Sequence, residues 1–547
     1  MMLYRTIGMA VLTLAAWFLT MRYNLHMLQL NGYKNVEHLK RTLRTWNRQW
    51  LLMAGVIPGV LRCIFRVLWV DIVCAVYLLL LILIYNLMRR TKAKKKLVYT
   101  ARVKRMLAAH VLVSAILPVV AWLVLGFDYL SAGLVLTVSL QWILLVLTNF
   151  LMKPAEKAVG NHYINDAKRR LREMGDRLTI IGVTGSYGKT SVKFYLKTLL
   201  SAKYDVLVTP ESFNTPMGVV RTIREQLRPS HEIFVCEMGA RHVGDIKEIC
   251  DIVHPKHGVI TSIGPQHLET FFTMDNIRST KYELADALPK DGMLFLNGDS
   301  EEVVKKAAEY PGAIFYHAGL AANATEVAAA NIGGSVVGAD SKATDSLSGY
   351  YATDIKVSSL GTEFTVHAPD GKEETFQTRL VGGHNVINII GAIAVANQLG
   401  IALSDLKIPV RRLEPVPHRM QLIGRGAVTI IDDAYNSNPV GSKAAVETLG
   451  LFDGVKILVT PGMVELGDKE AEYNKAFGGY AAKNCDYICL VGRKRAEPIA
   501  AGALEAGFPE EKLRIFDRLQ EALDFAYSIG DEGHKFILLE NDLPDNY

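Results

Sequence analysis

The stretch Leu178-Thr-Ile-Ile-Gly-Val-Thr-Gly-Ser-Tyr-Gly-Lys-Thr-Ser191 decides the fold of the larger part of this chain. Its apolar start predicts a buried strand, and the amphipathic residues 192–201 after it predict a helix. In a strand–loop–helix unit of this kind, backbone N–H groups and the helix N-terminus point at a bound phosphate. We therefore predict a phosphate-binding loop formed by Gly185, Ser186, Gly188, Lys189, Thr190 and Ser191.

Two side chains of this loop carry its chemistry. Lys189 supplies a point charge to the phosphates, and the Thr190 hydroxyl is a hard oxygen ligand for magnesium. The strict phosphate-loop pattern has glycine at the position of Val183, so this loop is a variant. A plain glycine-rich turn is the alternative interpretation.

Beyond residue 178, short apolar runs alternate with helical patterns and glycine-rich turns. This texture is typical of doubly wound α/β folds with parallel sheets. We predict a Rossmann-like central domain over residues 178–412 and a Rossmann-like C-terminal domain over residues 413–547. Residues 318–348, rich in Ala, Gly, Ser and Asp, are predicted to be a surface insertion in the central domain.

The N-terminal part has a different character. The 547-residue chain is 50% hydrophobic with a mean hydropathy of +0.16, which indicates a membrane-embedded fraction. We place this fraction in a transmembrane helical domain over residues 1–155, followed by a linker over residues 156–177. The predicted spans are residues 7–21, 68–88, 106–126 and 129–152, and residues 50–61 form either a fifth span or a re-entrant or interfacial segment.

The basic loop at residues 89–105 predicts the orientation, because such loops stay on the cytoplasmic side. The two spans that follow then form an outward-and-back hairpin. Residues 7–21 lack small residues at a cleavage position, so we expect an anchor and not a signal peptide. The predicted location is therefore the cell membrane, multi-pass, with the α/β domains in the cytoplasm.

Charge and cysteine content exclude some classes of protein. The formal net charge is +6, but the basic excess lies at residues 41–48 and 89–105, where it suits lipid headgroups. We therefore expect membrane lipid and no nucleic acid as a partner, and a monomer. The six cysteines form no C-x-x-C pair, so we predict reduced thiols and neither a zinc site nor a structural disulfide.

Further motifs follow the phosphate loop in a fixed order. They are Phe213-Asn-Thr-Pro-Met-Gly218, Glu237-Met-Gly-Ala240, Ile263-Gly-Pro-Gln-His-Leu-Glu269, Lys281-Tyr-Glu283, Asn297-Gly-Asp299, Gly383-His-Asn-Val-Ile-Asn388, Pro417-His-Arg419, Asp432-Asp-Ala-Tyr-Asn-Ser-Asn-Pro439 and Pro461-Gly-Met-Val-Glu-Leu-Gly467. With the T-G-x-x-G-K-T-S loop, this series resembles the Mur ligase family, especially its D-alanyl-D-alanine-adding members. The resemblance spans residues 178–470 and departs at Thr280, where the family has alanine. It does not reach residues 1–155, where the family has a soluble uridine-nucleotide domain.

The resemblance implies an ATP-dependent ligase for peptidoglycan precursors. In this family ATP phosphorylates a substrate carboxylate to an acyl phosphate, which an amine then attacks to form an amide. The implied cofactors are ATP and Mg²⁺, the latter at two sites. The implied substrates are a muramyl peptide, either uridine-linked or lipid-linked, and an amino acid or dipeptide.

The resemblance also implies roles for individual residues. Thr190 and Glu237 would hold one magnesium ion, and His267 and Lys281 would serve the second, with Lys281 as a carbamate. The alternatives are a solvated carboxylate at Glu237, a turn histidine at His267 and an unmodified surface lysine at Lys281. With Lys189 and Arg419, these three form the predicted catalytic set.

The remaining residues would bind nucleotide and substrate. Asn297 and Asn388 would face adenine, Arg419 the phosphates and Asp432 the ribose. The predicted substrate-binding residues are Asn214, Tyr435, Asn436 and Asn438. An amidating or amino-acid-tailoring ligase for a lipid-linked precursor is the alternative enzyme, and a non-catalytic membrane scaffold is the alternative outside enzymes.

Overall fold

The computed structural model describes residues 2–44, 46–65, 67–90, 96–210, 213–318, 349–435, 437–530 and 533–541. The chain forms two compact units, residues 1–162 and residues 163–543. Asn436 and the predicted insertion from residue 319 onward lie outside the described residues.

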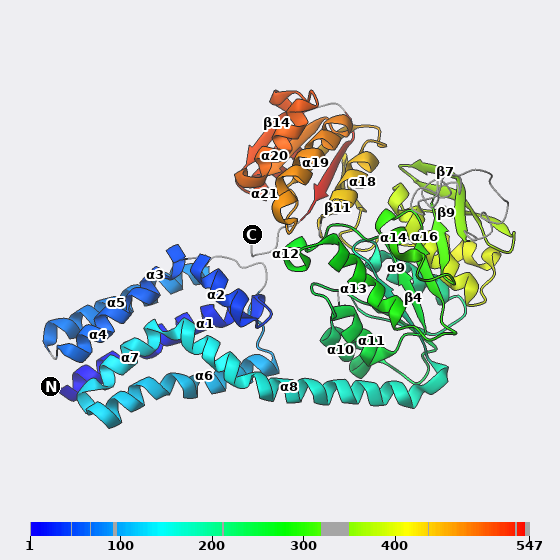
Figure 1. Cartoon of the computed structure of the whole chain (residues 1–547). Helices are drawn as coiled ribbons and strands as arrows, with labels where there is room; N and C mark the ends of the chain where they lie inside the picture. The colour runs from blue at the N-terminus through cyan, green and yellow to red at the C-terminus, as the bar shows by residue number, and fades with distance from the viewer. Residues whose placement is uncertain are drawn as a thin grey trace. The chain divides into compact units, whose positions relative to one another are not determined.

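The first unit is helical (Figure 1). Its helices are α1 (Met2–Leu30), α2 (Asn35–Arg44), α3 (Trp46–Ala54), α4 (Val56–Ile64), α5 (Leu68–Arg90), α6 (Ala101–Val120), α7 (Leu130–Ser139) and the first part of α8 (Gln141–Met174). Three helices of the described residues are long and apolar enough to cross a membrane: Tyr4–Leu30, Leu68–Leu87 and Ala101–Leu125. The predicted apolar helices therefore exist, and α8 continues as a helix through most of the predicted linker.

The last predicted span, residues 129–152, differs from a single straight helix. It consists of α7 and α8, which meet at a bend of 76° around Leu140. Thr137 and Ser139 donate their hydroxyl protons to carbonyls one turn back, at 2.8 and 2.9 Å, and such bonds tend to bend a helix. If the pair counts as one broken span, the described residues contain up to four spans.

The first sheet of the second unit has nine strands in the order β2-β3-β1-β4-β5-β6-β7-β8-β9. Strands β1 to β7 pair in parallel, and β7, β8 and β9 form an antiparallel extension. The strands are β1 (Thr179–Thr184), β2 (Val206–Val208), β3 (Ile233–Glu237), β4 (His257–Ile260), β5 (Leu294–Asn297), β6 (Ile314–His317), β7 (Tyr350–Ser358), β8 (Gly361–His367) and β9 (Glu373–Thr378).

Helices cover both faces of this sheet. Successive residues of a strand point to opposite faces, so neighbouring residues contact different helices. Ile181 and Val235 face α9 and α16, whereas Ile180 and Phe234 face α10 and α11. The helices of this layer are α9 (Lys189–Leu200), α10 (Pro216–Gln226), α11 (Asp245–Val253), α12 (Leu268–Phe271), α13 (Met274–Asp286), α14 (Glu301–Ala307), α16 (Gly383–Gln398) and α17 (Lys407–Arg411). The predicted strand at residues 178–183 and the helix after it are confirmed as β1 and α9.

The second sheet has six strands in the order β10-β11-β15-β12-β13-β14, parallel except for β10. The strands are β10 (Gln421–Arg425), β11 (Val428–Asp433), β12 (Val455–Thr460), β13 (Tyr487–Val491), β14 (Leu513–Phe516) and β15 (Lys535–Glu540), and the helices are α18 (Pro439–Leu449), α19 (Glu470–Asn484), α20 (Arg493–Glu505) and α21 (Leu519–Ser528). The predicted α/β fold is thus confirmed, with mixed rather than purely parallel sheets.

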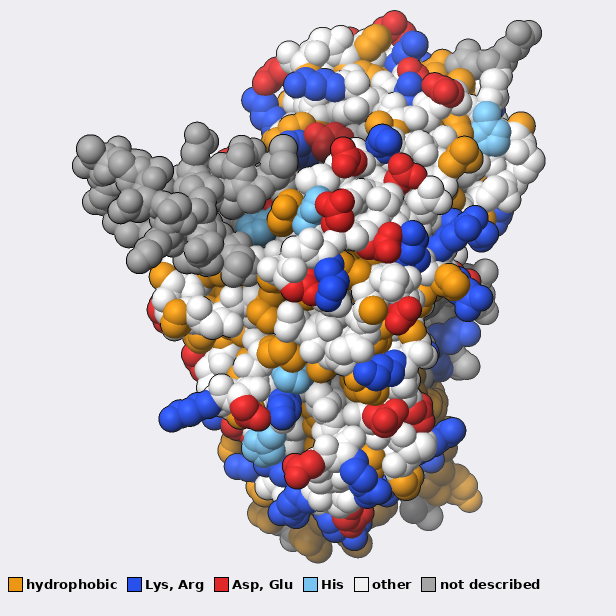
Figure 2. Space-filling model, turned by 90° about the vertical axis from the view of Figure 1, so that its right-hand side faces the viewer, with side chains coloured by type: hydrophobic (Ala, Val, Ile, Leu, Met, Phe, Trp, Pro, Cys, Tyr) orange, Lys and Arg blue, Asp and Glu red, His pale blue; other side chains and the backbone are white. Residues whose placement is uncertain are grey.

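Figure 2 shows one face of the molecule with acidic and basic side chains interspersed. On that face no continuous region of one charge sign covers the described residues. The net charge of +6 is therefore not gathered there into a single basic surface.

Candidate active site

The loop between β1 and α9 needs its glycines for steric reasons. Gly185 has φ +149° and Gly188 has φ +79°, both in the region that side chains rarely adopt. A Cβ on Gly185 would come within 2.0 Å of the Thr261 hydroxyl, and one on Gly188 within 2.5 Å of the Asn388 amide oxygen. Glycine is therefore required at both positions, because Thr261 and Asn388 pack directly against the backbone of the loop.

Lys189 folds back over this loop. Its Nζ donates to the carbonyl oxygens of Gly185 at 2.7 Å and Ser186 at 2.9 Å. Burial lowers the pKa of Lys189 to about 8, against the attraction of Glu237. An anion in the loop would give this buried ammonium a full countercharge in place of two carbonyl dipoles.

Glu237 is the last residue of β3, and its carboxylate contacts several polar side chains. Thr190 donates its hydroxyl proton to Oε1 at 3.1 Å, Asn214 donates to the same oxygen at 3.0 Å, and the Lys193 ammonium lies 2.9 Å from Oε2. Burial by itself raises the pKa of Glu237, but the charges of Lys193 and Lys189 and these hydrogen bonds outweigh it, so the pKa is lowered. Glu237 is an ionised, buried carboxylate and not a solvated loop residue.

Lys193, the lysine of the Val-Lys pair that follows the phosphate loop, is a component of this cluster for which the sequence predicted no role. Its side chain is fully buried, which is rare for lysine without a partner. One sequence feature points to it: Lys193 lies three residues after Thr190, which places both on one face of the helix.

The geometry of this cluster fits a magnesium ion. Thr190 Oγ1 and Glu237 Oε1 are 3.1 Å apart, close to the about 2.9 Å edge expected of an octahedron with metal–oxygen bonds of about 2.0–2.1 Å. Among the described residues, no group of three or more His, Cys, Asp or Glu side chains is placed to hold a metal alone. Magnesium suits such a site, because it usually keeps waters and takes further oxygens from substrate phosphates.

His267 lies where the central half of the second unit meets its C-terminal half. Its backbone has φ +55°, and its Nδ1 pairs with the carboxylate of Glu465, a residue of the 461–467 motif. Burial lowers the pKa of His267, while Glu465 opposes the shift. When Nδ1 donates to that carboxylate, Nε2 keeps its lone pair, which is how metal-binding histidines are commonly oriented. The sequence motif contained Glu465 without indicating this pairing.

Lys281 is a buried residue of α13 and not a surface lysine. It is 2% exposed, and burial together with the charge of Lys189 lowers its pKa to about 7. Within the described part of the chain its ammonium makes no hydrogen bond, and it lies 6.0 Å from the ring centre of Phe271. A substantial fraction of this amine is therefore neutral near pH 7, as reaction with carbon dioxide requires.

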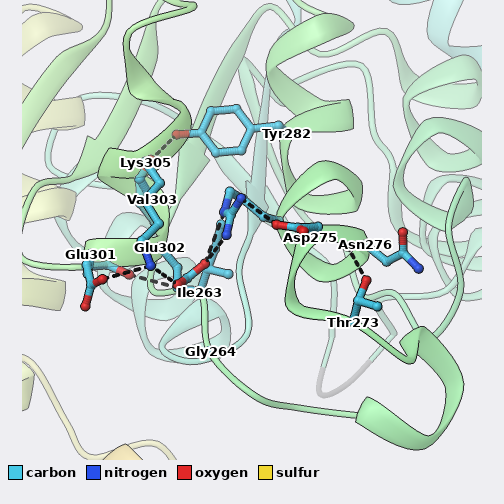
Figure 3. Close-up of polar contacts among 12 residues, drawn as sticks. Ile263, Gly264, Thr273, Asp275, Asn276, Tyr282, Glu301, Glu302, Val303 and Lys305 are labelled. Atoms are coloured by element: carbon cyan, nitrogen blue, oxygen red, sulfur yellow. Dashed lines mark hydrogen bonds and ion pairs between the residues drawn. The ribbon is translucent and has the colours of Figure 1, made fainter. Parts of the chain in front are cut away.

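Several contacts fix the helix that carries Lys281 (Figure 3). Arg278 donates to Glu302 of α14 at 2.6 and 3.1 Å and to Asp275 at 2.9 Å. The buried Tyr282 donates its hydroxyl proton to the carbonyl of Val303 at 2.5 Å. These bonds tie α13 to α14 on both sides of Lys281.

The predicted catalytic residues share one neighbour. The charge of Lys189 acts on the pKa values of Glu237, His267 and Lys281, and the pKa of Lys189 in turn responds to Arg419. These four residues, from four different segments, therefore lie close enough to Lys189 for their charges to interact.

The two predicted adenine-side asparagines have different surroundings. The side-chain amide of Asn297, at the end of β5, makes hydrogen bonds within the protein. It donates to the Ser262 hydroxyl at 3.0 Å and accepts from the Asp299 N–H at 2.9 Å. Asn388 lies on α16 directly against Gly188. Asn388 is thus placed beside the phosphate loop.

The segment leading into the second sheet contains Arg419. The residues on either side, His418 and Met420, have positive φ angles of 59° and 47°. The Arg419 guanidinium lies 4.8 Å from the ring centre of Tyr435, and Asp432 accepts a hydrogen bond at 2.8 Å from His418 when that ring is protonated at Nδ1. Arg419 therefore belongs to a conformationally strained connection between the two sheets.

The predicted amine-side residues follow β11. Tyr435 is half exposed, whereas Asn438 is buried and caps α18 by accepting from the Gly441 N–H at 2.8 Å. The side chain of Asn438 therefore stabilises the start of α18. Asn436 lies outside the described residues.

Comparisons with known proteins identify the family of the α/β unit. The family model of the Mur ligase middle domain matches residues 183–396, and that of the Mur ligase glutamate ligase domain matches residues 418–539. The UDP-N-acetylmuramoyl-tripeptide–D-alanyl-D-alanine ligase of Bacillus subtilis (strain 168) is 32% identical over 343 residues, covering 62% of this chain and 67% of that protein. The same-named enzyme of Escherichia coli (strain K12) is 30% identical, covering 62% and 70%.

A solved structure gives the same result. A crystal structure of MurF from Acinetobacter baumannii matches with a TM-score of 0.60 and 26% identity, covering 71% of this chain and 78% of that one. The two family models begin and end within the second unit, so the helical first unit lies outside both. This chain belongs to the Mur ligase family.

Proposed function

We propose that this chain is an ATP-dependent ligase that joins D-alanyl-D-alanine to UDP-N-acetylmuramoyl tripeptide in peptidoglycan synthesis. The observation that carries the proposal is the Glu237 carboxylate, ionised and buried beside Thr190 of the phosphate loop. The names of the relatives from B. subtilis and E. coli supply the substrates.

The residues around the loop suit phosphoryl transfer, which depends on positioning and on neutralising charge. Lys189 and Arg419 neutralise charge on the transferred phosphoryl group. Thr190 and Glu237 would hold a magnesium ion, which would neutralise phosphate charge when bound. Transfer of the terminal phosphoryl group of ATP to the acceptor carboxylate releases ADP and gives an acyl phosphate. Attack of the neutral amine on its carbonyl carbon then expels inorganic phosphate and releases a proton.

His267 and Lys281 serve a second magnesium site in this proposal. The neutral fraction of the Lys281 amine combines with carbon dioxide and releases a proton, which gives a carbamate with one negative charge shared by two oxygens. The lowered pKa of Lys281 and its lack of a hydrogen-bond partner among the described residues support this role. Asn388 and Asp432 complete the nucleotide site.

We further infer that the helical first unit is embedded in the cell membrane, with the α/β unit in the cytoplasm. Three helices of this unit have the length and apolar composition of membrane spans. Apolar side chains on the outside of two of these helices also support the inference, because Leu79, Leu83, Leu112 and Ile116 are all more than half exposed. A helix that is apolar on all sides is stable in water only when something covers it, and lipid does so here.

A second candidate function follows from the same helices. A ligase held in the bilayer could amidate or tailor a lipid-linked muramyl peptide with the same acyl phosphate chemistry. The position of both family matches outside the helical unit favours this candidate, because the part that would recognise the acceptor differs from the matched domains.

One experiment separates the two candidates. The purified full-length protein receives ATP, either UDP-linked or polyprenyl-linked muramyl tripeptide, and either D-alanyl-D-alanine or ammonia, and products are identified by mass. Dipeptide addition to the UDP-linked acceptor supports the first proposal. Product from the lipid-linked acceptor alone supports the second, and no ATP-dependent product with any pair contradicts both.

A further inference from the structure

The Glu237 carboxylate is held from both of its oxygens by one helix. Thr190 donates to Oε1 at 3.1 Å, and the Lys193 Nζ lies 2.9 Å from Oε2. The two residues are three positions apart on α9 and so share a helix face. Asn214 adds a second hydrogen bond to Oε1 at 3.0 Å.

The ion pair between Lys193 and Glu237 is buried at both ends, with side-chain exposures of 0% and 1%. Burying two charges is expensive, and a buried pair is favourable only when its geometry and hydrogen bonds are good. A pair that only stabilised the fold could be replaced by apolar side chains at little cost. Here one partner lies beside the phosphate loop, so its orientation matters for what the loop binds.

We propose that Lys193 is a positioning residue that holds Oε2 of Glu237 and leaves Oε1, beside the Thr190 hydroxyl, as the one carboxylate oxygen presented to nucleotide-bound magnesium. The inference rests on the proposed function in one respect, that Thr190 and Glu237 face this magnesium. Without Lys193 the carboxylate is held at Oε1 alone, by Thr190 and Asn214, and the octahedral edge between Thr190 and Glu237 is less firmly fixed.

The test is the magnesium dependence of nucleotide binding to the full-length protein. Binding of a non-hydrolysable ATP analogue is measured by calorimetry across a magnesium titration and again with the metal chelated. Loss of a residue that orients a metal ligand weakens metal binding by about 10–100-fold. We therefore expect Lys193→Met to raise the half-saturating magnesium concentration by about that factor, with metal-free binding unchanged. Lys197→Met, an exposed lysine one turn further along the same helix, is the matched control.

Two results would overturn the proposal. One is a magnesium titration of Lys193→Met that coincides with that of Lys197→Met. The other is an equal loss of binding with and without magnesium, which would indicate general distortion of the loop. If Lys193→Met does not fold, Lys193→Gln replaces it with the same criteria.

The design keeps this inference separate from the ligase assignment. The titration contains neither acceptor nor amine, so it is independent of the substrates. A wrong ligase assignment would appear as missing amide product from the unaltered protein, whatever the result of the titration.

Discussion

At the scale of single residues, two buried lysines beside the phosphate loop have pKa values suited to different tasks. Lys189, with a pKa near 8, is mostly charged at pH 7 and can neutralise phosphate. Lys281, with a pKa near 7, is neutral for a large part of the time and can react as an amine. Replacing Lys189 by Ala should lower ATP-dependent amide synthesis by about 100-fold or more, measured as product formation, whereas Lys197→Ala should keep full activity.

The low pKa of Lys281 predicts a pH-dependent stability. In the unfolded chain the amine has its ordinary pKa of 10.5, against about 7 in the folded protein. Between these values the unfolded state binds more protons, so rising pH stabilises the native protein, by at most about 1.4 kcal/mol per pH unit. Lys281→Met should therefore stabilise the α/β unit most at pH 7, and its advantage should shrink towards pH 10. Thermal unfolding without bicarbonate measures this, and a pH-independent difference between variant and parent would exclude it.

The carbamate proposal has its own test. Lys281→Ala should lose about 100-fold of the ligase activity, because the carbamate oxygens that would bind the second magnesium ion are lost. Acetate or formate, which can enter the vacated space, should restore part of that activity. Full activity of Lys281→Ala without additives would rule out the carbamate.

At the scale of single elements, α13 is positioned through Arg278, which reaches Glu302 and Asp275 (Figure 3). Arg278→Met should lower the stability of the α/β unit by about 1–3 kcal/mol, because it removes two charge-assisted hydrogen bonds from the half-buried Glu302, which keeps its bond to Lys305. It should also lower activity, since Lys281 sits one turn further along α13. Lys290→Met, exposed just beyond this helix, is the control, and equal stability of the two variants would contradict this role for Arg278.

The elements of the phosphate loop could be predicted from the sequence because their signals are local. The apolar run of β1, the glycines and the start of α9 lie within fourteen residues, 178–191. The bend between α7 and α8 could not, since it arises at Leu140 inside a continuous apolar stretch. Lys193 and Glu465 were not predicted either, because their partners, Glu237 and His267, are distant in the sequence and meet only in the folded chain.

At the scale of the whole molecule, the helical unit predicts behaviour that a soluble ligase would not show. Leu112 is 72% exposed on α6, and an arginine there would cost about 2.5–3.5 kcal/mol of membrane insertion if it lies near the bilayer centre. Leu112→Arg should therefore reduce the fraction of protein that stays in membranes after alkaline washing. Leu112→Ala is the matched control. Equal membrane retention of both variants, or release of the unaltered protein by the wash, would contradict membrane embedding.

The central claim is that the α/β unit uses ATP to phosphorylate a carboxylate before the amine attacks. The most direct measurement is oxygen transfer: the acceptor's reacting carboxylate is labelled with ¹⁸O, and the inorganic phosphate released during turnover is analysed by mass. An acyl phosphate predicts one ¹⁸O atom in each released phosphate, and about 100-fold less labelled phosphate in the same time with Lys189→Ala. Amide product accompanied by unlabelled phosphate would contradict the claim.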